Sequence, residues 1–109
     1  MPEADVFEIL ADPTRRSLIK ALRDGERSVS ELVDEVSIDQ PGVSKQLRRL
    51  HEAGFVDVRP DGQKRLYSLR PEPFRELEEW MQDYRRLWDA RLDKLAAHLA
   101  QQKKHKDVK

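Results

Sequence analysis

The sequence predicts a mainly α-helical fold with one small β-hairpin, and three observations lead to that class. Apolar residues recur every three or four positions in most of the chain, which is the period of an α-helix. Between residues 55 and 69 this period gives way to short runs rich in β-branched and aromatic residues. After Pro73 the helical period returns. The expected order is four short helices, two strands and one long helix, which is a winged helix-turn-helix.

Two short helices are expected at the N-terminal end. The first carries a compact apolar cluster, which consists of Val6, Phe7, Ile9 and Leu10. Asp12 and Pro13 end it and start the second helix, because Asp is a good N-cap and Pro fits the first helical turn. Gly25 ends the second helix. Arg15 and Arg16 fall on its outer side, where we expect a solvated face.

The next two helices form a helix-turn-helix. Either Ser28 or Ser30 caps the third helix, which ends at Ser37. Asp39 caps the fourth helix and Gly54 ends it, so this helix spans roughly residues 40 to 53. Two short helices joined by about four residues have the helix-turn-helix arrangement.

The fourth helix has an apolar face and a polar face. Its apolar positions recur at i, i+4 and i+7 and should face the core, and they are Val43, Leu47 and Leu50. The other face is small, amide-bearing and basic, and it consists of Gln40, Pro41, Gly42, Ser44, Lys45, Arg48 and Arg49. A helix that enters a DNA major groove needs small residues for close approach, and it needs Gln, Lys and Arg to reach phosphates and base edges. The competing interpretation is a charged face that contacts only solvent.

The hairpin after Gly54 should form a basic wing beside this recognition helix. Residues 55–59 read as its first strand and residues 64–69 as the return, with a turn at Pro60-Asp61-Gly62. The polar and basic residues near the tip are Arg59, Gln63, Lys64 and Arg65. We expect Gln63, Lys64 and Arg65 to contact DNA.

Charge is unevenly distributed although its sum is zero, with 21 basic and 21 acidic side chains. Residues 1–39 carry 5 basic and 10 acidic residues, residues 40–70 carry 7 and 3, and residues 71–109 carry 9 and 8. Positive charge is therefore concentrated in the recognition helix and wing, where phosphate neutralisation would require it.

These segments resemble a known family. QPGVSKQLRRLHEAGFVDVRPDGQKRLYSL resembles the winged helix of the arsenical-resistance repressor (ArsR) family of bacterial transcription regulators, and FEILADPTRRSLIKAL is similar to its first two helices. With the last helix, the resemblance covers about residues 4–99. It implies a homodimeric repressor that binds double-stranded DNA, and such repressors often regulate themselves. A protein-interaction winged helix and a DNA-binding activator stay open as alternatives.

The last helix is predicted to be the main dimer interface. Its apolar stripe runs from Phe74 to Leu99, which is roughly 26 residues or about 40 Å. One small domain cannot cover that length, so a second copy should pack on it together with the first helix, although packing on its own domain is the alternative. The expected interface residues are Val6, Phe7, Leu10, Trp80, Tyr84, Trp88, Leu92 and Leu95. Residues 1–100 should form one domain, followed by a disordered basic tail at 101–109.

Several other functions find no support in the sequence. No cysteine is present, and the family's sensors carry paired cysteines where this chain has residues 28–32. The three histidines, at 51, 98 and 105, are far apart, so we expect no metal or cofactor, although a site shared across a dimer through His98 stays open.

No nucleophile or phosphate-binding motif indicates an enzyme. No apolar run indicates a membrane span or signal peptide, and we expect a cytoplasmic protein whose effector, if one exists, is a small molecule or a partner protein.

Overall fold

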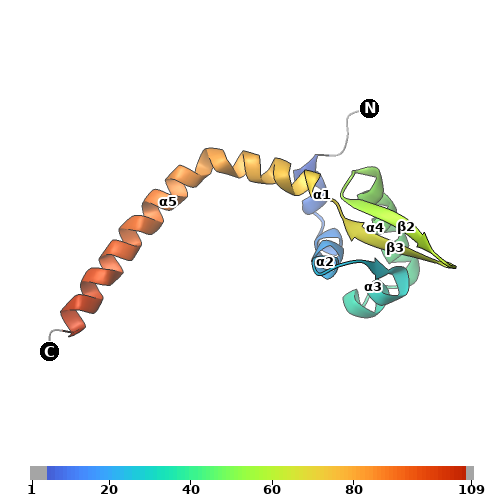
Figure 1. Ribbon diagram of the computed structural model, residues 1–109, viewed down its shortest axis with the longest axis horizontal. Coiled ribbons are helices and arrows are strands. Elements are labelled where there is room, and N and C mark those ends of the chain that lie inside the picture. The colour runs from blue at the N-terminus through green and yellow to red at the C-terminus, as the bar shows by residue number, and fades with distance from the viewer. Residues whose placement is uncertain (1–4, 108–109) are drawn as a thin grey trace. The chain divides into compact units, whose positions relative to one another are not determined.

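The computed structural model describes the backbone of residues 5–107 and the side chains of residues 5–101. The described part contains five helices and three strands (Figure 1). In chain order they are α1 (Val6–Leu10), α2 (Pro13–Ala21), β1 (Arg27–Ser28), α3 (Val29–Val36), α4 (Gln40–Glu52), β2 (Val56–Asp61), β3 (Lys64–Leu69) and α5 (Glu72–Asp107). The mainly α-helical class with a small hairpin is confirmed. The chain divides into two compact units, Met1–Glu76 and Leu77–Lys109.

The core of the first unit draws on both its helices and its hairpin. The fully buried side chains are Ile9, Leu18, Leu22, Leu32, Val43, Leu47, Leu50, Phe55 and Val56. The predicted α4 stripe is confirmed, because Val43, Leu47 and Leu50 each have 0% exposure. Full burial of one such side chain stabilises the fold by about 1.5–3 kcal/mol relative to an exposed one.

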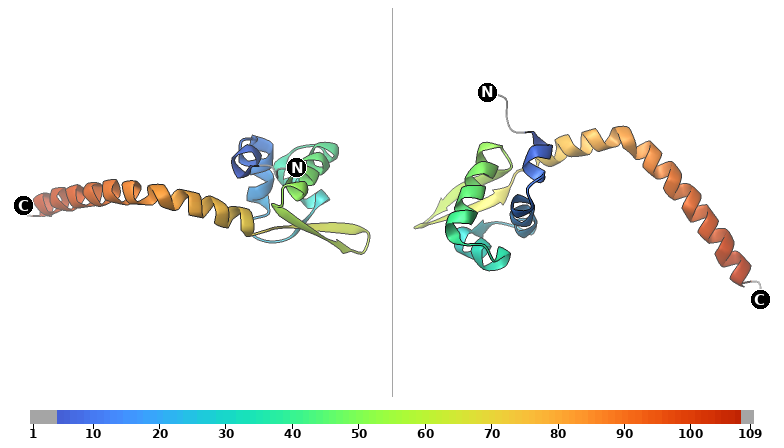
Figure 2. Two further views of the ribbon diagram at one scale, coloured as in Figure 1. Left: turned by 90° about the horizontal axis from the view of Figure 1, so that it is seen from above. Right: turned by 180° about the vertical axis from the view of Figure 1, so that it is seen from behind.

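The β-sheet has a strand that the sequence pattern did not reveal. β1 pairs antiparallel with β3, with Arg27 opposite Tyr67 and Ser28 opposite Leu66, so the strand order is β1-β3-β2. Two residues are too few to show the alternation of a strand. The β2–β3 hairpin projects beyond the helices of the first unit (Figure 2).

The hairpin turn lies further along the chain than predicted. Pro60 and Asp61 belong to β2, where they pair with Arg65 and Lys64. The loop is therefore Gly62-Gln63, and the expected turn at Pro60-Asp61-Gly62 is wrong. Gly62 has a φ of 63° at the first loop position, where a two-residue hairpin needs positive φ. Pro60 is tolerated because β2 is an edge strand.

The predicted helix caps are confirmed. Oδ1 of Asp12 accepts a hydrogen bond from the Thr14 backbone N–H at 2.7 Å. Ser28, not Ser30, caps α3 through a reciprocal pair of bonds. The Ser28 hydroxyl accepts from the Glu31 N–H at 3.3 Å, and the Glu31 carboxylate accepts from the Ser28 N–H at 3.0 Å. The bond from the Ser28 backbone lowers the pKa of Glu31, because it stabilises the ionised carboxylate.

Arg15 and Arg16 of α2 were expected to contact only solvent, but both donate hydrogen bonds to the backbone of α1. Nε of Arg15 donates to the carbonyl oxygen of Ile9 at 2.9 Å, and Nη2 donates to that of Glu8 at 3.1 Å. Nη1 of Arg16 donates to the carbonyl oxygen of Leu10 at 2.6 Å. The last carbonyls of a helix lack partners within it, so these bonds complete the end of α1.

The last helix is longer than the apolar stripe indicated. α5 continues through residues 101–107, where a disordered tail was expected, and Val108 and Lys109 lie outside the described residues. The extension contains no Pro or Gly to end the helix.

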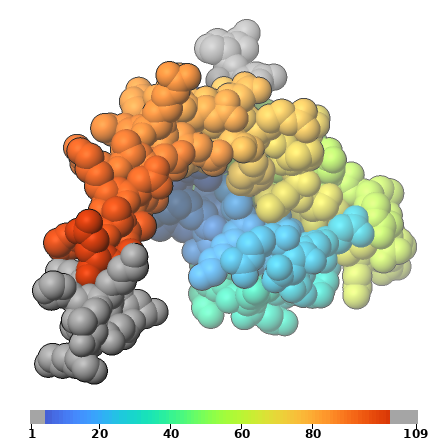
Figure 3. Space-filling view, turned by 60° about the vertical axis from the view of Figure 1, so that its left-hand side comes forward, coloured from blue at the N-terminus to red at the C-terminus, as the bar shows by residue number. Residues whose placement is uncertain are grey.

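The second unit carries an exposed apolar stripe along α5. Every residue from 78 to 101 is exposed in the chain. Figure 3 shows one face of this segment, coloured orange to red. The large apolar residues among them are Trp80, Met81, Tyr84, Leu87, Trp88, Leu92, Leu95 and Leu99, with exposures of 47% to 67%. A helix that exposes such a stripe has surface available for another chain to cover.

The capping box predicts a measurable loss of stability in the variant Ser28→Ala. Removal of the N-cap hydroxyl leaves a backbone N–H of α3 without its acceptor and should cost about 0.5–2 kcal/mol in the free energy of unfolding. Ser17→Ala is the matched control, since Ser17 is exposed on α2 and should cost less than about 0.5 kcal/mol. Urea titration of both variants measures the difference, and equal stabilities would contradict the capping role.

Candidate nucleic-acid interface

The helix pair α3–α4 holds the polar face of α4 toward solvent. Residues 37–39 connect the helices, and Oδ1 of Asp39 accepts from the Gly42 N–H at 2.9 Å. Because Val43, Leu47 and Leu50 are buried, the opposite face is directed outward. Its exposed members are Gln40, Pro41, Ser44, Lys45, Arg48 and Arg49.

Gly42 has a role within the fold in addition to the expected close approach to DNA. A Cβ at this position would lie 2.6 Å from Oδ1 of Asp39 and 2.9 Å from Cγ2 of Ile38. A side chain here would therefore push against the cap that starts α4. Gly42 is half-buried, so it is less accessible than its neighbours Pro41 and Ser44.

The structure separates the basic residues of this surface into two groups. Arg49 belongs to the first group, because its Nη2 bonds Oε1 of Glu8 in α1 at 2.9 Å. Arg59 also belongs to it. Nε and Nη2 of Arg59 donate to the two carboxylate oxygens of Glu26, at 2.7 and 3.0 Å. This bond lowers the pKa of Glu26 and raises the pKa of Arg59, because it stabilises both charged forms. Arg59 is thus neutralised locally instead of adding charge to the wing.

The second group consists of Lys45, Arg48, Lys64 and Arg65, all of which are exposed. Within the described part of the chain, none of these four side chains has a carboxylate at ion-pair distance. Their charges are therefore available to an anionic partner. Two of them lie on α4 and two on β3, so the helix and the hairpin both contribute.

Two shallow recesses gather the expected site residues. The first, of about 310 Å³, lies between the start of α4 and the wing, and it is lined by Ser28, Val29, Ser30, Gln40, Gln63, Lys64 and Arg65. The second, of about 480 Å³, runs along α4 and is lined by Arg15, Lys45, Gln46, Arg48, Arg49 and Glu52. Residues from elements far apart in sequence thus meet at the start of α4 and along it.

The first recess includes residues that sequence reasoning did not assign to the site. Ser28, Val29 and Ser30 lie where β1 ends and α3 begins, and the pairing of β1 with β3 brings this segment to the wing. Because that pairing spans only two residues, no period in the sequence indicated it. In the second recess, Arg15 also donates to Oε1 of Gln46 at 3.3 Å, which connects α2 to α4.

The expected dimer residues have different exposures. Val6 is only 6% exposed, so it packs within its own unit and offers little surface to a partner. Phe7 is 44% exposed, and Leu10 is half-buried. The α5 members of the set are exposed, and they are Trp80, Tyr84, Trp88, Leu92 and Leu95.

Metal-ligating residues do not gather in the described part of the chain. Among those residues, no group of three or more His, Asp or Glu side chains could hold a metal ion. His51 is exposed on α4 and His98 on α5, whereas the side chain of His105 lies outside the described residues. In the same part of the chain, no helix is both long and apolar enough to span a membrane.

The helix pair, the hairpin and their shared basic surface define a winged helix-turn-helix protein. Comparison with known proteins gives the family. Residues 12–58 match the family model described as bacterial regulatory protein, arsR family. The chain is 36% identical to a solved structure described as a possible transcriptional regulator for arsenical resistance. That match covers 86% of this chain and 95% of the other, with a TM-score of 0.68. The chain belongs to the ArsR family.

The chain is also similar to two proteins that are named as repressors. The probable mercury resistance operon repressor of Streptomyces lividans is 44% identical over 66 residues, which are 61% of this chain and 53% of the relative. The structure of the transcriptional repressor BigR from Xylella fastidiosa is 30% identical, with a TM-score of 0.60, and the match covers 72% of this chain and 82% of that one.

Family membership agrees with the expectation that the chain is not an enzyme, since the relatives are regulatory proteins. The matched part of the chain spans 53% to 61% of the length of three curated relatives.

Proposed function

We propose that this protein is a sequence-specific DNA-binding transcriptional regulator, a cytoplasmic homodimeric repressor of a partly palindromic operator. One observation carries the proposal. Lys45 and Arg48 on α4 and Lys64 and Arg65 on the wing are exposed, and within the described residues they lack carboxylate partners. Protein cations without partners are the groups that neutralise DNA phosphates and release counterions.

The position of each side chain suggests a division of labour on DNA. Gln40, Ser44 and Lys45 lie in the first two turns of α4, which is the part of a recognition helix that reaches base edges. Arg48, one turn later, contacts base or phosphate. Gln63 and Arg65 on the wing contact the backbone or the adjacent minor groove.

A homodimer accounts for the exposed stripe of α5. Burial of large apolar side chains such as Trp88, which is 67% exposed, would stabilise the association of two copies. A two-fold dimer also presents two recognition helices to two half-sites, whose centres lie about one or two helical turns apart.

We also propose that metal ions do not control the DNA affinity of this regulator. Relatives are named for mercury and arsenic resistance, but this chain has no cysteine with which to bind those thiophilic elements.

The division of labour predicts different effects of substitutions on the recognition helix and on the wing. Gln40→Ala or Lys45→Ala should cost about 1–3 kcal/mol on the cognate operator and relax base preference, because a base contact is lost. Arg65→Ala should weaken all sequences evenly and reduce the slope of log affinity against log salt by about 1, because a phosphate contact is lost. Fluorescence anisotropy with operator and scrambled duplexes at several salt concentrations measures both effects.

The control for these variants is Lys94→Ala, an exposed α5 residue outside the basic surface, which should bind like the wild type. The operator is a duplex that the protein itself selects from random sequences. If the Lys45→Ala, Arg48→Ala double variant bound it with undiminished affinity, α4 would not be the recognition helix. A protein-interaction role for the winged helix would then replace the proposal.

The exposed stripe predicts a dimer in solution. Sedimentation equilibrium at micromolar concentration should give about twice the chain mass of 12.8 kDa. Trp88→Glu should shift the protein to monomer, because an unpaired charge would have to be buried in the interface, whereas Lys94→Glu should not. A clean wild-type monomer would refute the interface and the half-site argument together.

The absence of thiolate ligands predicts that DNA binding is indifferent to metal ions. Operator affinity should be the same with Zn²⁺, with arsenite and with a chelator, and the wild type measured without additions is the reference. A reproducible tenfold shift, about 1.4 kcal/mol, would instead establish a metal site shared between subunits, with His98→Ala as the variant that identifies it.

A further inference from the structure

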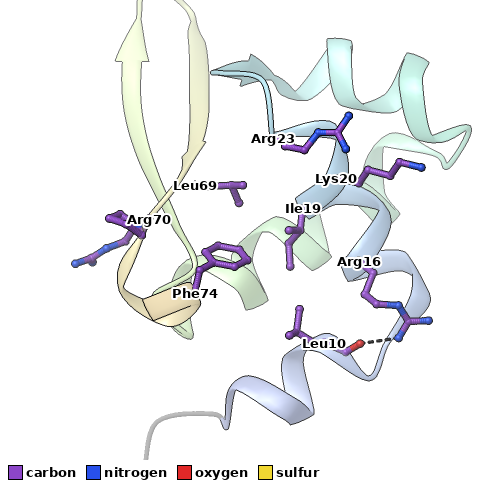
Figure 4. Close-up of a pocket in the computed structure, with 9 residues that line it drawn as sticks. Leu10, Arg16, Ile19, Lys20, Arg23, Leu69, Arg70 and Phe74 are labelled. Carbon is purple, nitrogen blue, oxygen red and sulfur yellow. Dashed lines mark hydrogen bonds between the residues drawn. The ribbon is translucent and has the colours of Figure 1, made fainter. Parts of the chain in front are cut away.

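An apolar groove lies in the first unit, away from the basic surface of α4 and the wing. It has a volume of about 620 Å³ and lies between α1, α2, the end of β3 and the start of α5 (Figure 4). Leu10, Ile19, Leu69 and Phe74 point into the same space, and each is only half-buried. The volume falls within the range of about 300–1,000 Å³ that is typical of small-molecule sites.

One side of this groove carries three cations from α2 and from the residues directly after it. Arg16 and Lys20 occupy positions i and i+4 of α2, so they lie on one face of the helix, and Arg23 lies two residues after its end; all three line the groove and are exposed. Among the residues that the structure describes, no acidic one lines the groove. Arg70 contributes only its stem, because its guanidinium is directed away from the groove, toward Asp57 and Glu72 at 3.9 and 3.4 Å (Figure 4).

These cations retain capacity for a ligand. No carboxylate of the described residues lies at ion-pair distance from Lys20. Within the described side chains, the one carboxylate at ion-pair distance from Arg23 belongs to its sequence neighbour Asp24, at 3.7 Å in an exposed pair, and such pairs are weak. Lys20 and Arg23 also lie near the C-terminal end of α2, where positive charge stabilises the helix dipole. The dipole accounts for these two charges, but it does not account for the half-buried apolar surface beside them.

We propose that this groove binds a small amphipathic organic anion, with a carboxylate at Lys20 and Arg23 and an apolar chain or ring against Ile19, Leu69 and Phe74. A carboxylate forms charge-assisted hydrogen bonds with ammonium and guanidinium groups. The apolar body removes the exposed floor from water, which a bare phosphate or other inorganic anion cannot do. A cationic amphiphile would be repelled by the same cations.

The groove is connected to the end of the recognition helix. Phe74 in the floor packs edge-on against Phe55, with ring centroids 5.8 Å apart. The Phe55 N–H donates to the carbonyl oxygen of Leu50 in α4 at 2.9 Å, and the Arg70 N–H donates to that of Phe55 at 2.8 Å. A ligand against Phe74 is therefore connected to α4 through a single intervening residue, Phe55. This consequence rests on the proposed function: if the protein binds an operator, occupancy of the groove changes its affinity for that operator.

The experiment titrates the full chain, without DNA, with octanoate, 1-octanol and octylammonium by isothermal titration calorimetry. Octanoate should saturate at one molecule per chain and bind at least about tenfold more tightly than the other two. The double variant Lys20→Gln, Arg23→Gln should weaken octanoate binding at least about tenfold. Arg91→Gln, Lys94→Gln is the matched control on α5, with the same spacing of exposed cations, and should bind octanoate like the wild type.

Three results would overturn the site. Failure of octanoate to saturate would refute the site. Equal affinity for the Lys20→Gln, Arg23→Gln variant and the wild type would exclude these two cations as the groups that bind the carboxylate. Octanoate that dissociates a dimer in sedimentation assigns the groove to a second copy of the chain. Because this titration needs no DNA, its failure is distinct from failure of the proposed function. Coupling is then read from operator affinity with and without octanoate, and an unchanged affinity with the groove occupied would overturn the regulatory consequence.

Discussion

The burial of one side of α4 is the constraint on which the rest of the candidate interface depends. Val43, Leu47 and Leu50 are fully buried, and they fix the rotation of the helix about its axis. Because an α-helix is rigid over three or four turns, this rotation determines which side chains face outward. Lys45 and Arg48 are exposed for that reason, since a shift of one residue would turn the helix by about 100°. The core of the first unit therefore positions the basic surface, and the cap at Asp39 sets where it begins.

Ion pairing decides how much of the positive charge on this surface can act on a partner. Residues 40–70 contain seven basic and three acidic side chains, which overstates the available charge. Within the described part of the chain, three of the seven are in ion pairs. Arg49 and Arg59 pair with Glu8 and Glu26, which come from the acidic first third of the chain, and Arg70 pairs with Asp57 and Glu72. Four cations remain without such partners among the described residues, and they are divided equally between α4 and the wing. Two of the three paired cations are thus neutralised by the acidic N-terminal segment, and which cations stay available is a property of the fold rather than of composition.

The features that could be predicted from the sequence are local ones. Asp12, Ser28 and Asp39 cap their helices through bonds to residues at most three positions away, and the α4 stripe follows from the helical period alone. The features that could not be predicted depend on contacts across the fold. β1 is recognisable only through its pairing with β3, and Arg15 was expected to be solvated because its acceptors lie on a separate helix. The hairpin turn was misplaced for a related reason, since strand register, and not the turn residues alone, assigns Pro60 to β2.

Two arginines connect the short helix α1 to α4. Arg15 donates to the backbone of α1 and also to Gln46 of α4, and Arg49 of α4 reaches back to Glu8 of α1. α1 has only five residues and its own hydrogen bonds cannot hold it in place, so these contacts and the burial of Val6 and Ile9 determine its position. Phe7, on the same short helix, is 44% exposed and belongs to the expected dimer surface. A partner chain that packed on Phe7 would therefore act on a helix whose polar contacts lead directly to α4. The hydrogen bonds from Arg15 and Arg49 therefore give the proposed dimer and DNA-binding surfaces of the first unit a direct physical connection.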